Sequence, residues 1–252
     1  MKSKKSKKQG QDFIDHLSEE VLPDVLIPIK NSDKDEWSES WYKGRNLLNI
    51  PQAWRGVFIG APGAGKSTAI KNIIVRTKPE FQQIILYHLD DNSSEWDDIV
   101  VKKIKEIPDP TSFNNKEKKL LILEDINLSN MAKNDKNKLN RLMGYCSSHC
   151  NMSIAITTQN AFDLSPSIRR MCNLFVIFRQ IDINALITLA SRCGLKSKHM
   201  LFIMSKLIRQ PYDSFWIECI RDSPAPYRIN GFQKVTVEQL DSGIRSVIEK
   251  GP

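Results

Sequence analysis

The sequence lacks any run of about 18 consecutive apolar residues, which a membrane-spanning helix needs, so no membrane span is expected. No apolar segment follows the lysines near the N-terminus, and a secretory signal is therefore not expected. Cysteine is scarce, with five residues in 252, an odd number that predicts reduced thiols in a cytosolic or nuclear setting. The guanine-reading pattern Asn-Lys-x-Asp and the second signalling motif of transporter ATPases are also missing, which disfavours both classes.

Positive charge is present in excess but unevenly spread. The sequence has 37 Lys and Arg against 29 Asp and Glu, a net charge of +8. Five of these charges are lysines within residues 1–10, so a basic tail precedes a nearly balanced domain. Such a tail suits nucleic acid, an acidic membrane surface or a nuclear-import receptor, although composition alone favours a solvated, disordered terminus.

The chain is predicted to divide into four parts. Residues 1–10 form the basic disordered tail, and residues 11–50 form a polar N-terminal extension. Residues 51–235 form an α/β domain, and residues 236–252 form a C-terminal helix or tail. Short apolar runs alternate with amphipathic stretches in the α/β domain, which predicts a mostly parallel central sheet flanked by helices.

The expected elements follow from these apolar and amphipathic patterns. Strands are expected at Trp54–Ile59, Gln83–His88, Lys119–Leu123, Ser153–Thr157, Leu174–Arg179 and Phe215–Ile220. Helices are expected at Lys66–Thr77, Lys133–Cys146, Pro166–Met171, Ile183–Cys193, Lys198–Leu207 and Thr236–Lys250. The segment Asp222–Asn230 contains two prolines and is expected to be a turn leading into a last short strand.

One segment matches the phosphate-binding pattern G-x-x-x-x-G-K-[ST], the Walker A motif, between an expected strand and an expected helix. Its residues, with the threonine that follows, are Gly60, Ala61, Pro62, Gly63, Ala64, Gly65, Lys66, Ser67 and Thr68. Glycines let the backbone wrap around phosphate, and the helix start adds its positive dipole end. Lys66 is expected to neutralise the β- and γ-phosphates of ATP, and the Ser67 hydroxyl to bind Mg²⁺.

Two adjacent acids follow the apolar strand Lys119–Leu123, as in a Walker B motif. Neighbouring side chains at a strand end point to opposite sides, so the two carboxylates can take different roles. By their order, Glu124 is expected beside Mg²⁺ and Asp125 is expected to act as the general base. A strand ending in a solvated acidic turn is the alternative interpretation.

Polar and basic residues at later strand ends complete the candidate site. Gln159 follows an apolar strand and is expected to orient the attacking water or sense the γ-phosphate. Arg169 and then Arg170 are the candidates for an arginine supplied to a neighbouring subunit, with Arg179 as a further possibility. Ion pairs or solvated positions explain any single arginine nearly as well.

Two further groups of residues are candidates for a metal site and for DNA contacts. Cys146, His149 and Cys150 are spaced closely enough for a metal site, but half-buried cysteines on a helix explain them better. Candidate DNA-contacting residues, which equally fit solvated helix faces, are Lys133, Lys136, Lys138, Lys196, Lys198, Lys206 and Arg209.

The order of these motifs resembles the FtsK–HerA superfamily of P-loop NTPases. It runs from the phosphate loop through Leu-Leu-Ile-Leu-Glu-Asp and Ile-Thr-Thr-Gln to Ser-Ile-Arg-Arg-Met-Cys-Asn-Leu-Phe-Val-Ile-Phe-Arg. Within that superfamily, about residues 45–232 are similar to poxvirus-type genome-packaging ATPases of large eukaryotic DNA viruses, virophages and Polinton-like elements. The resemblance implies a RecA-like fold whose metal and base acids fall on Glu124 and Asp125. The family order is Asp-Glu or Asp-Asp, so the division of roles between these two acids stays open.

The resemblance also implies function and partners. It implies a homo-oligomeric ring, in the family usually a hexamer, that hydrolyses ATP to move double-stranded DNA into a preformed capsid, docking at a portal or vertex. The expected location is the host cytoplasm at a viral factory, the nucleus, or the virion. Two alternatives stay open: a nucleoside or nucleotide kinase with a lid at Asp90–Ser112, and a nucleotide-regulated binding module with slow turnover.

Overall fold

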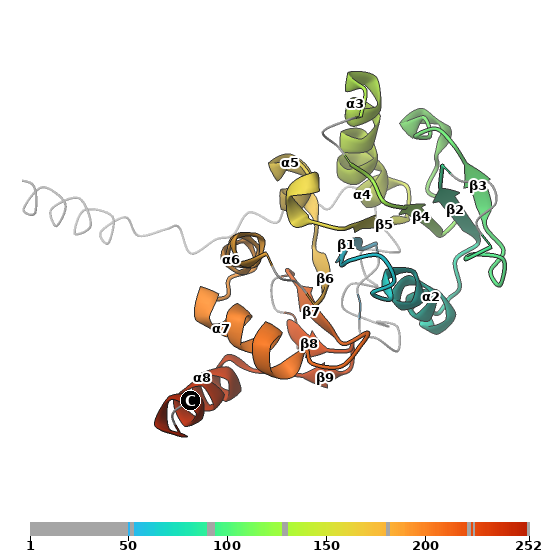
Figure 1. The fold of residues 1–252 in the computed structure, drawn as a ribbon. Coiled ribbons are helices and arrows are strands. Elements are labelled where there is room, and N and C mark those ends of the chain that lie inside the picture. The colour runs from blue at the N-terminus through green and yellow to red at the C-terminus, as the bar shows by residue number, and fades with distance from the viewer. Residues whose placement is uncertain are drawn as a thin grey trace, which may run out of the picture. The chain divides into compact units, whose positions relative to one another are not determined.

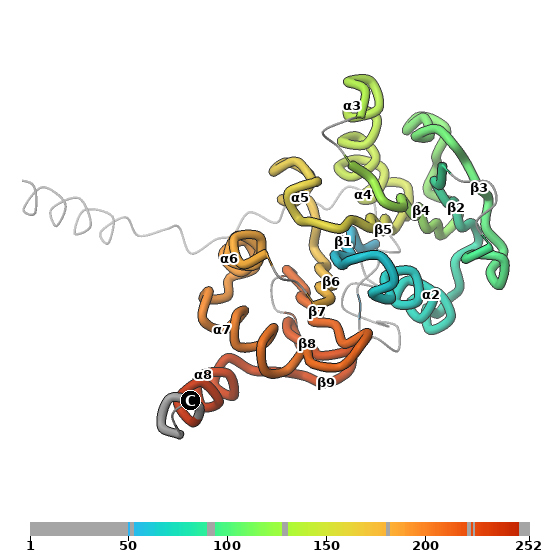
Figure 2. The backbone as a smooth tube through the Cα atoms, viewed as in Figure 1, coloured from blue at the N-terminus to red at the C-terminus, as the bar shows by residue number. Residues whose placement is uncertain are grey.

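The structure is a computed structural model that describes residues 50, 53–89, 94–127, 131–179, 182–220, 223 and 225–250. All of these residues belong to one compact unit. The predicted tail 1–10 and, apart from Ile50, the predicted extension 11–50 lie outside the described residues. Figure 2 traces the described chain from β1 in blue to α8 in red.

A single sheet forms the centre of the described residues, in the order β3-β2-β4-β5-β1-β6-β7-β8-β9 (Figure 1). The parallel strands are β1 (Arg55–Ile59), β2 (Gln83–Tyr87), β3 (Lys102–Ile104), β4 (Lys119–Leu123), β5 (Met152–Thr158) and β6 (Leu174–Phe178). The antiparallel strands are β7 (Ser214–Glu218), β8 (Tyr227–Ile229) and β9 (Gln233–Lys234). The mostly parallel sheet flanked by helices is therefore confirmed.

Helices cover both faces of this sheet. They are α2 (Lys66–Arg76), α3 (Lys133–Arg141), α4 (Ser147–His149), α5 (Pro166–Met171), α6 (Ile183–Arg192), α7 (Ser197–Phe202) and α8 (Val237–Lys250). The apolar side chains of α2 pack on one face with Phe58 of β1. Side chains of α3 and of α5–α7 pack on the other face with Val57 and Ile59, as alternation along a strand requires. The burial of both faces explains the near-continuous apolar runs of these strands.

Most expected elements form with ends shifted by one or two residues, and β4 and α5 have the expected bounds. Helix α3 ends at Arg141, and Leu142–Cys146 continue it as a π-helical turn. Helix α7 likewise passes into a π-helical turn at Ile203–Leu207.

Two strands were not expected. Strand β3 is short, and its two lysines are exposed at the edge of the sheet, so it has no apolar run to mark it. Strand β8 lies inside Asp222–Asn230, so the prediction of a turn across that whole segment is wrong. Tyr227 and Ile229 are at least partly covered because β8 pairs antiparallel with the preceding strand β7, a pairing that local composition does not indicate. Among the described residues, none of the helices is both long and apolar enough to cross a membrane.

The C-terminal helix α8 is attached to α7 through a carboxylate. Asp241 of α8 accepts a hydrogen bond from the Lys198 amino group at 2.6 Å and lies 3.0 Å from Nε2 of the buried His199. Both contacts hold the pKa of Asp241 well below its usual range. An acid with a lowered pKa in the folded chain stabilises it above the unfolded pKa, near 4, and that stabilisation is lost as the pH falls toward the lower folded value.

Asp241→Asn should therefore loosen α8 at pH 7, because the amide cannot form the charged pair with Lys198. Backbone amides of residues 237–246 should exchange with deuterium several-fold faster than in the wild type, while amides of β4 should be unchanged. Ser242→Ala, on the exposed side of the same helix, is the matched control. Equal protection of α8 in the wild type and Asp241→Asn would show that the pair does not hold the helix.

Candidate nucleotide site

The phosphate loop Gly60–Gly65 joins β1 to α2 at the carboxyl edge of the parallel strands. It is anchored by the Gly60 N–H, which donates to the Thr158 carbonyl of β5 at 3.1 Å. Gly63 and Gly65 have φ angles of 73° and 98°, in the left-handed region that a side chain disfavours. The glycine spacing of the motif therefore meets a conformational need of this loop.

The N-terminus of α2 is open to an anion. Gly65 is its N-cap residue, no side chain caps the helix, and no acidic residue occupies its first turn. The first backbone N–H groups of a helix have no partner within the helix, and the helix dipole adds positive potential there. This end of α2 is therefore suited to a phosphate group.

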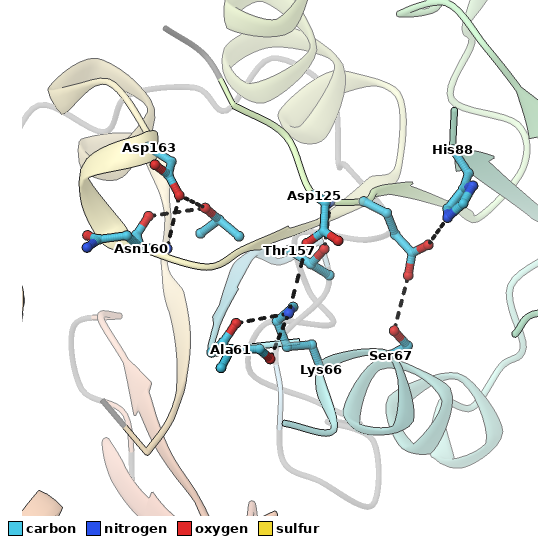
Figure 3. Close-up of polar contacts among 11 residues, drawn as sticks. Ala61, Lys66, Ser67, His88, Asp125, Thr157, Asn160 and Asp163 are labelled. Atoms are coloured by element: carbon cyan, nitrogen blue, oxygen red, sulfur yellow. Dashed lines mark hydrogen bonds and ion pairs between the residues drawn. The ribbon is translucent and has the colours of Figure 1, made fainter. Parts of the chain in front are cut away.

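Lys66 is 8% exposed and folds back over the loop (Figure 3). Its amino group donates to the carbonyl oxygens of Gly60 at 2.9 Å and Ala61 at 3.2 Å. It also lies 3.9 Å from Oδ1 of Asp125. These oxygens satisfy the buried ammonium, and phosphate oxygens can replace them because they offer the same kind of acceptor.

Glu124 connects the loop helix to the sheet. The Ser67 hydroxyl donates to its Oε1 at 3.1 Å, and Nε2 of His88 lies 3.4 Å from its Oε2 (Figure 3). Burial raises the pKa of Glu124, while the nearby Trp96 indole, the Ser67 hydroxyl and His88 oppose that rise. The carboxylate therefore sits where a bound cation would stabilise its charged form.

Asp125 differs from Glu124 in exposure and direction. Its side chain is 63% exposed and its backbone has a φ of 44°, an uncommon conformation that aspartate tolerates better than most residues. The Asp125 N–H donates to the hydroxyl of the buried Thr157 at 2.9 Å, which fixes this turn to β5. Glu124 thus lies beside Ser67 and Asp125 beside Lys66, and the roles expected of the two acids stay predictions.

The donor set beside α2 fits Mg²⁺. The ion prefers oxygen ligands and in nucleotide sites usually takes one or two protein side chains, with phosphates and waters completing the shell. Ser67 and Glu124 supply a hydroxyl and a carboxylate oxygen that already meet at 3.1 Å. Within the described ranges, no group of three or more His, Cys, Asp and Glu side chains could hold a metal by itself.

Gln159 directly follows β5 and is exposed at the edge that carries the phosphate loop. The turn after it is fixed by Asp163, which accepts from the Thr158 hydroxyl at 2.8 Å and the Asn160 N–H at 3.0 Å (Figure 3). Gln159 therefore lies at a strand end that the following turn holds in place, and its expected role toward the attacking water or the γ-phosphate stays a prediction.

The three arginines differ in their surroundings. Arg169 is half-buried and donates to the carbonyl oxygens of Ala161 at 2.8 Å and Leu164 at 2.6 Å, so it braces the turn before α5. Arg170 and Arg179 are exposed. These two hydrogen bonds explain the position of Arg169 by contacts within its own chain. The assignment of an arginine that acts on a neighbouring subunit stays a prediction.

The two remaining groups of candidates are the cysteines with His149 and the basic residues. The thiols of Cys146 and Cys150 donate to the carbonyl oxygens of Pro110 at 3.4 Å and Phe113 at 3.6 Å, while the His149 ring stacks on Tyr145. These cysteines are therefore packed in the core. Of the basic candidates, the exposed ones are Lys133, Lys196, Lys198, Lys206 and Arg209, and Lys198 is paired with Asp241. The half-buried Lys138 is paired with Asp135.

Two residues of the site were missed by sequence reasoning. His88 was expected only as a strand end, and Trp96 lay in a segment considered as a lid. The buried Trp96 ring lies under the Lys71 amino group of α2, 5.4 Å from the ring centroid, and beside Glu124. Both residues reach Glu124 through pairing of β2 with β4 and packing against α2, which no local pattern in the sequence indicates.

Together, the sheet, the glycine-rich loop and the paired acids define a P-loop nucleoside-triphosphatase fold. The structure is similar to that of the DNA-packaging ATPase B204 from Sulfolobus turreted icosahedral virus, with 16% identity, 70% of this chain and 96% of that chain covered, and a TM-score of 0.53. The genome packaging NTPase B204 of Sulfolobus turreted icosahedral virus 2 in complex with AMP matches with 14% identity, 71% and 98% coverage, and a TM-score of 0.52. Its complex with AMPPCP matches with 14% identity, the same coverage and a TM-score of 0.50.

These similarities confirm the fold that the resemblance to packaging ATPases implies, and at such identities they concern the fold alone. No protein-family model matches the sequence, and no curated protein matches it significantly.

Glu124→Gln should reduce the contribution of Mg²⁺ to nucleotide binding, because glutamine has the shape of glutamate and lacks the negative charge that attracts the ion. In calorimetric titrations with and without EDTA, the gain in ADP affinity from Mg²⁺ should fall by about tenfold in this variant. Glu95→Gln removes an exposed carboxylate near Glu124 and should preserve the gain. An unchanged gain in Glu124→Gln would remove Glu124 from the metal site.

Proposed function

We propose that this chain is an ATP-hydrolysing motor that moves double-stranded DNA during viral genome packaging. The observation that carries the proposal is the meeting of Lys66, Ser67, Glu124 and Asp125 at one sheet edge. The similarity to the fold of B204 packaging ATPases supports the biological role.

The side chains divide the work of hydrolysis. Lys66 leaves the carbonyl oxygens of Gly60 and Ala61 and binds the β- and γ-phosphate oxygens. Ser67 and Glu124 would hold Mg²⁺, which would neutralise charge on the phosphates. Asp125 accepts a proton from the attacking water as the new P–O bond forms and the bond to the ADP oxygen breaks. Gln159 positions that water from the end of β5.

The motor acts as a ring of identical subunits, which we expect to be a hexamer. An arginine from one subunit stabilises the charge that develops on the phosphate bound by the next. Arg170 is now the preferred candidate, because Arg169 is engaged by two carbonyl oxygens of its own chain. The capsid portal or vertex, and a location in the viral factory, nucleus or virion, remain parts of this proposal.

Two other functions were considered, and one observation weighs against the kinase. The proposed lid segment Asp90–Ser112 contributes β3 to the sheet and Trp96 to the core within its described part, residues 94–112. A segment built into the sheet is poorly suited to close over an acceptor. A binding module would hydrolyse ATP slowly even with DNA, whereas a motor would hydrolyse it faster when DNA is added. The ATPase rate with DNA therefore distinguishes the two.

Thr157→Val should slow ATP hydrolysis, because it removes the hydroxyl that holds the Asp125 backbone and so displaces the Asp125 carboxylate. Turnover of ATP should fall by up to about 10²-fold with little change in KM, since a small displacement of a catalytic group has that effect. Thr157→Ser keeps the hydroxyl and should retain most of the turnover. Equal rates in the valine and serine variants would show that this hydrogen bond does not position Asp125.

The ATPase rate of the wild type should rise when long duplex DNA is added. The DNA concentration that gives half of this stimulation should rise steeply between 50 and 200 mM salt, because DNA affinity falls by about 10³-fold over that range for a protein that contacts six phosphates. Lys66→Ala and Asp125→Asn should abolish hydrolysis and still bind DNA. A hydrolysis rate unaffected by DNA would reject the motor and favour the binding module. Phosphate transfer from ATP to a nucleoside, without DNA, would favour the kinase.

A further inference from the structure

A cavity adjoins the phosphate loop on the side away from the acids. Its volume is about 320 Å³, at the lower end of small-molecule pockets. Gly65, Thr68 and Asn72 line it from the loop and α2. Tyr212, Trp216 and Phe232 line it from the antiparallel part of the sheet.

The position of this cavity follows from consecutive residues of α2. Ser67 is turned toward Glu124, whereas Thr68 lines the cavity. A nucleotide whose terminal phosphates lie at Lys66 and Glu124 would continue past Thr68, and its base would then enter the cavity.

Two aromatic rings at this cavity are unusually exposed. Tyr212 is 71% exposed and Phe232 is 63% exposed, although most large apolar side chains of the domain are buried. The Tyr212 ring lies over Gly65, since a methyl group there would come within 3.3 Å of Cδ1 of the ring. Exposed rings beside a phosphate site are suited to stacking on a nucleobase.

The turn that carries Tyr212 is held in a strained conformation. Tyr212 has a φ of 69°, which is rare for a bulky residue. Asp213 accepts hydrogen bonds from the backbone N–H groups of Arg209 at 3.1 Å and Gln210 at 2.8 Å, and from the side-chain amide of Asn230 at 2.9 Å. These contacts fix the ring at the cavity, and strain of this kind is often found at ligand sites.

The polar side chains around the cavity are already engaged. Asn72 donates to the Thr68 carbonyl at 2.9 Å and accepts from Arg76. Asn230 donates to Asp213 and accepts from the Ser214 N–H at 2.8 Å, and the Ser214 hydroxyl accepts from Trp216. The Thr68 and Tyr212 hydroxyls can each donate or accept, so they suit adenine and guanine equally.

We propose that this cavity binds the nucleotide base by stacking on Tyr212 and Phe232, with little discrimination between adenine and guanine. The inference rests on the proposed function, because it requires the phosphates to bind at Lys66. A site that reads a base by dedicated hydrogen bonds can reject the wrong one by 10⁴-fold or more, whereas shape and stacking alone cannot. The substrates of this site therefore include GTP as well as ATP.

Calorimetric titrations with ADP, GDP and pyrophosphate in the presence of Mg²⁺ test this proposal without turnover. Wild-type affinities for ADP and GDP should differ by less than about tenfold. Phe232→Ala and Tyr212→Gly should each weaken ADP and GDP binding by about 5- to 150-fold and leave pyrophosphate binding unchanged. Glycine suits the φ of Tyr212, so this variant should fold, and Tyr212→Phe should restore binding.

Tyr145→Ala is the matched control, since Tyr145 is also an exposed tyrosine but stacks on His149. Unchanged ADP affinity in both pocket variants, or a preference for ADP over GDP above about tenfold, would overturn the base site. A wild-type protein that bound neither ADP nor pyrophosphate would instead overturn the proposed function, on which this inference rests.

Discussion

The parallel pairing of β1 between β5 and β6, with β4 on the far side of β5, is the constraint on which the rest of this structure depends. It brings the carboxyl ends of these strands to one edge. The phosphate loop leaves β1 there, the two acids leave β4, and Gln159 leaves β5. The hydrogen bond from Ser67 to Glu124 then joins α2 to β4 across the intervening strand.

Buried charge makes this edge a binding site as well as a structural junction. Lys66 is buried and needs acceptors, which the loop carbonyls supply, while Glu124 is buried and its raised pKa reflects the cost of its charge. Phosphates and a divalent cation would satisfy both groups better than the chain does alone. The site is therefore built around charges that a nucleotide complements, and the rigid strand ends keep reorganisation small.

The sequence predicts the centre of this fold better than its edges. The phosphate loop, β4 and α5 follow from local patterns, namely glycine spacing, a continuous apolar run, and a short amphipathic stretch. Strands β3 and β8 are short, carry lysines or an arginine, and form by pairing with the preceding strands β2 and β7, so no apolar run of their own marks them. Likewise the loop and acids of the site were predicted, whereas the contacts of His88 and Trp96 with Glu124, the bracing by Arg169 and the aromatic cavity depend on packing between remote segments.

Above all, we expect the loop carbonyls to hold Lys66 in the place where phosphate binds. The decisive measurement is an experimental structure of the chain with Mg²⁺ and a non-hydrolysable ATP analogue. The Lys66 amino group should leave Gly60 and Ala61 for phosphate oxygens, and Ser67 and Glu124 should be the residues that hold Mg²⁺. A nucleotide bound elsewhere, with Lys66 still on the two carbonyl oxygens, would show that this expectation is wrong.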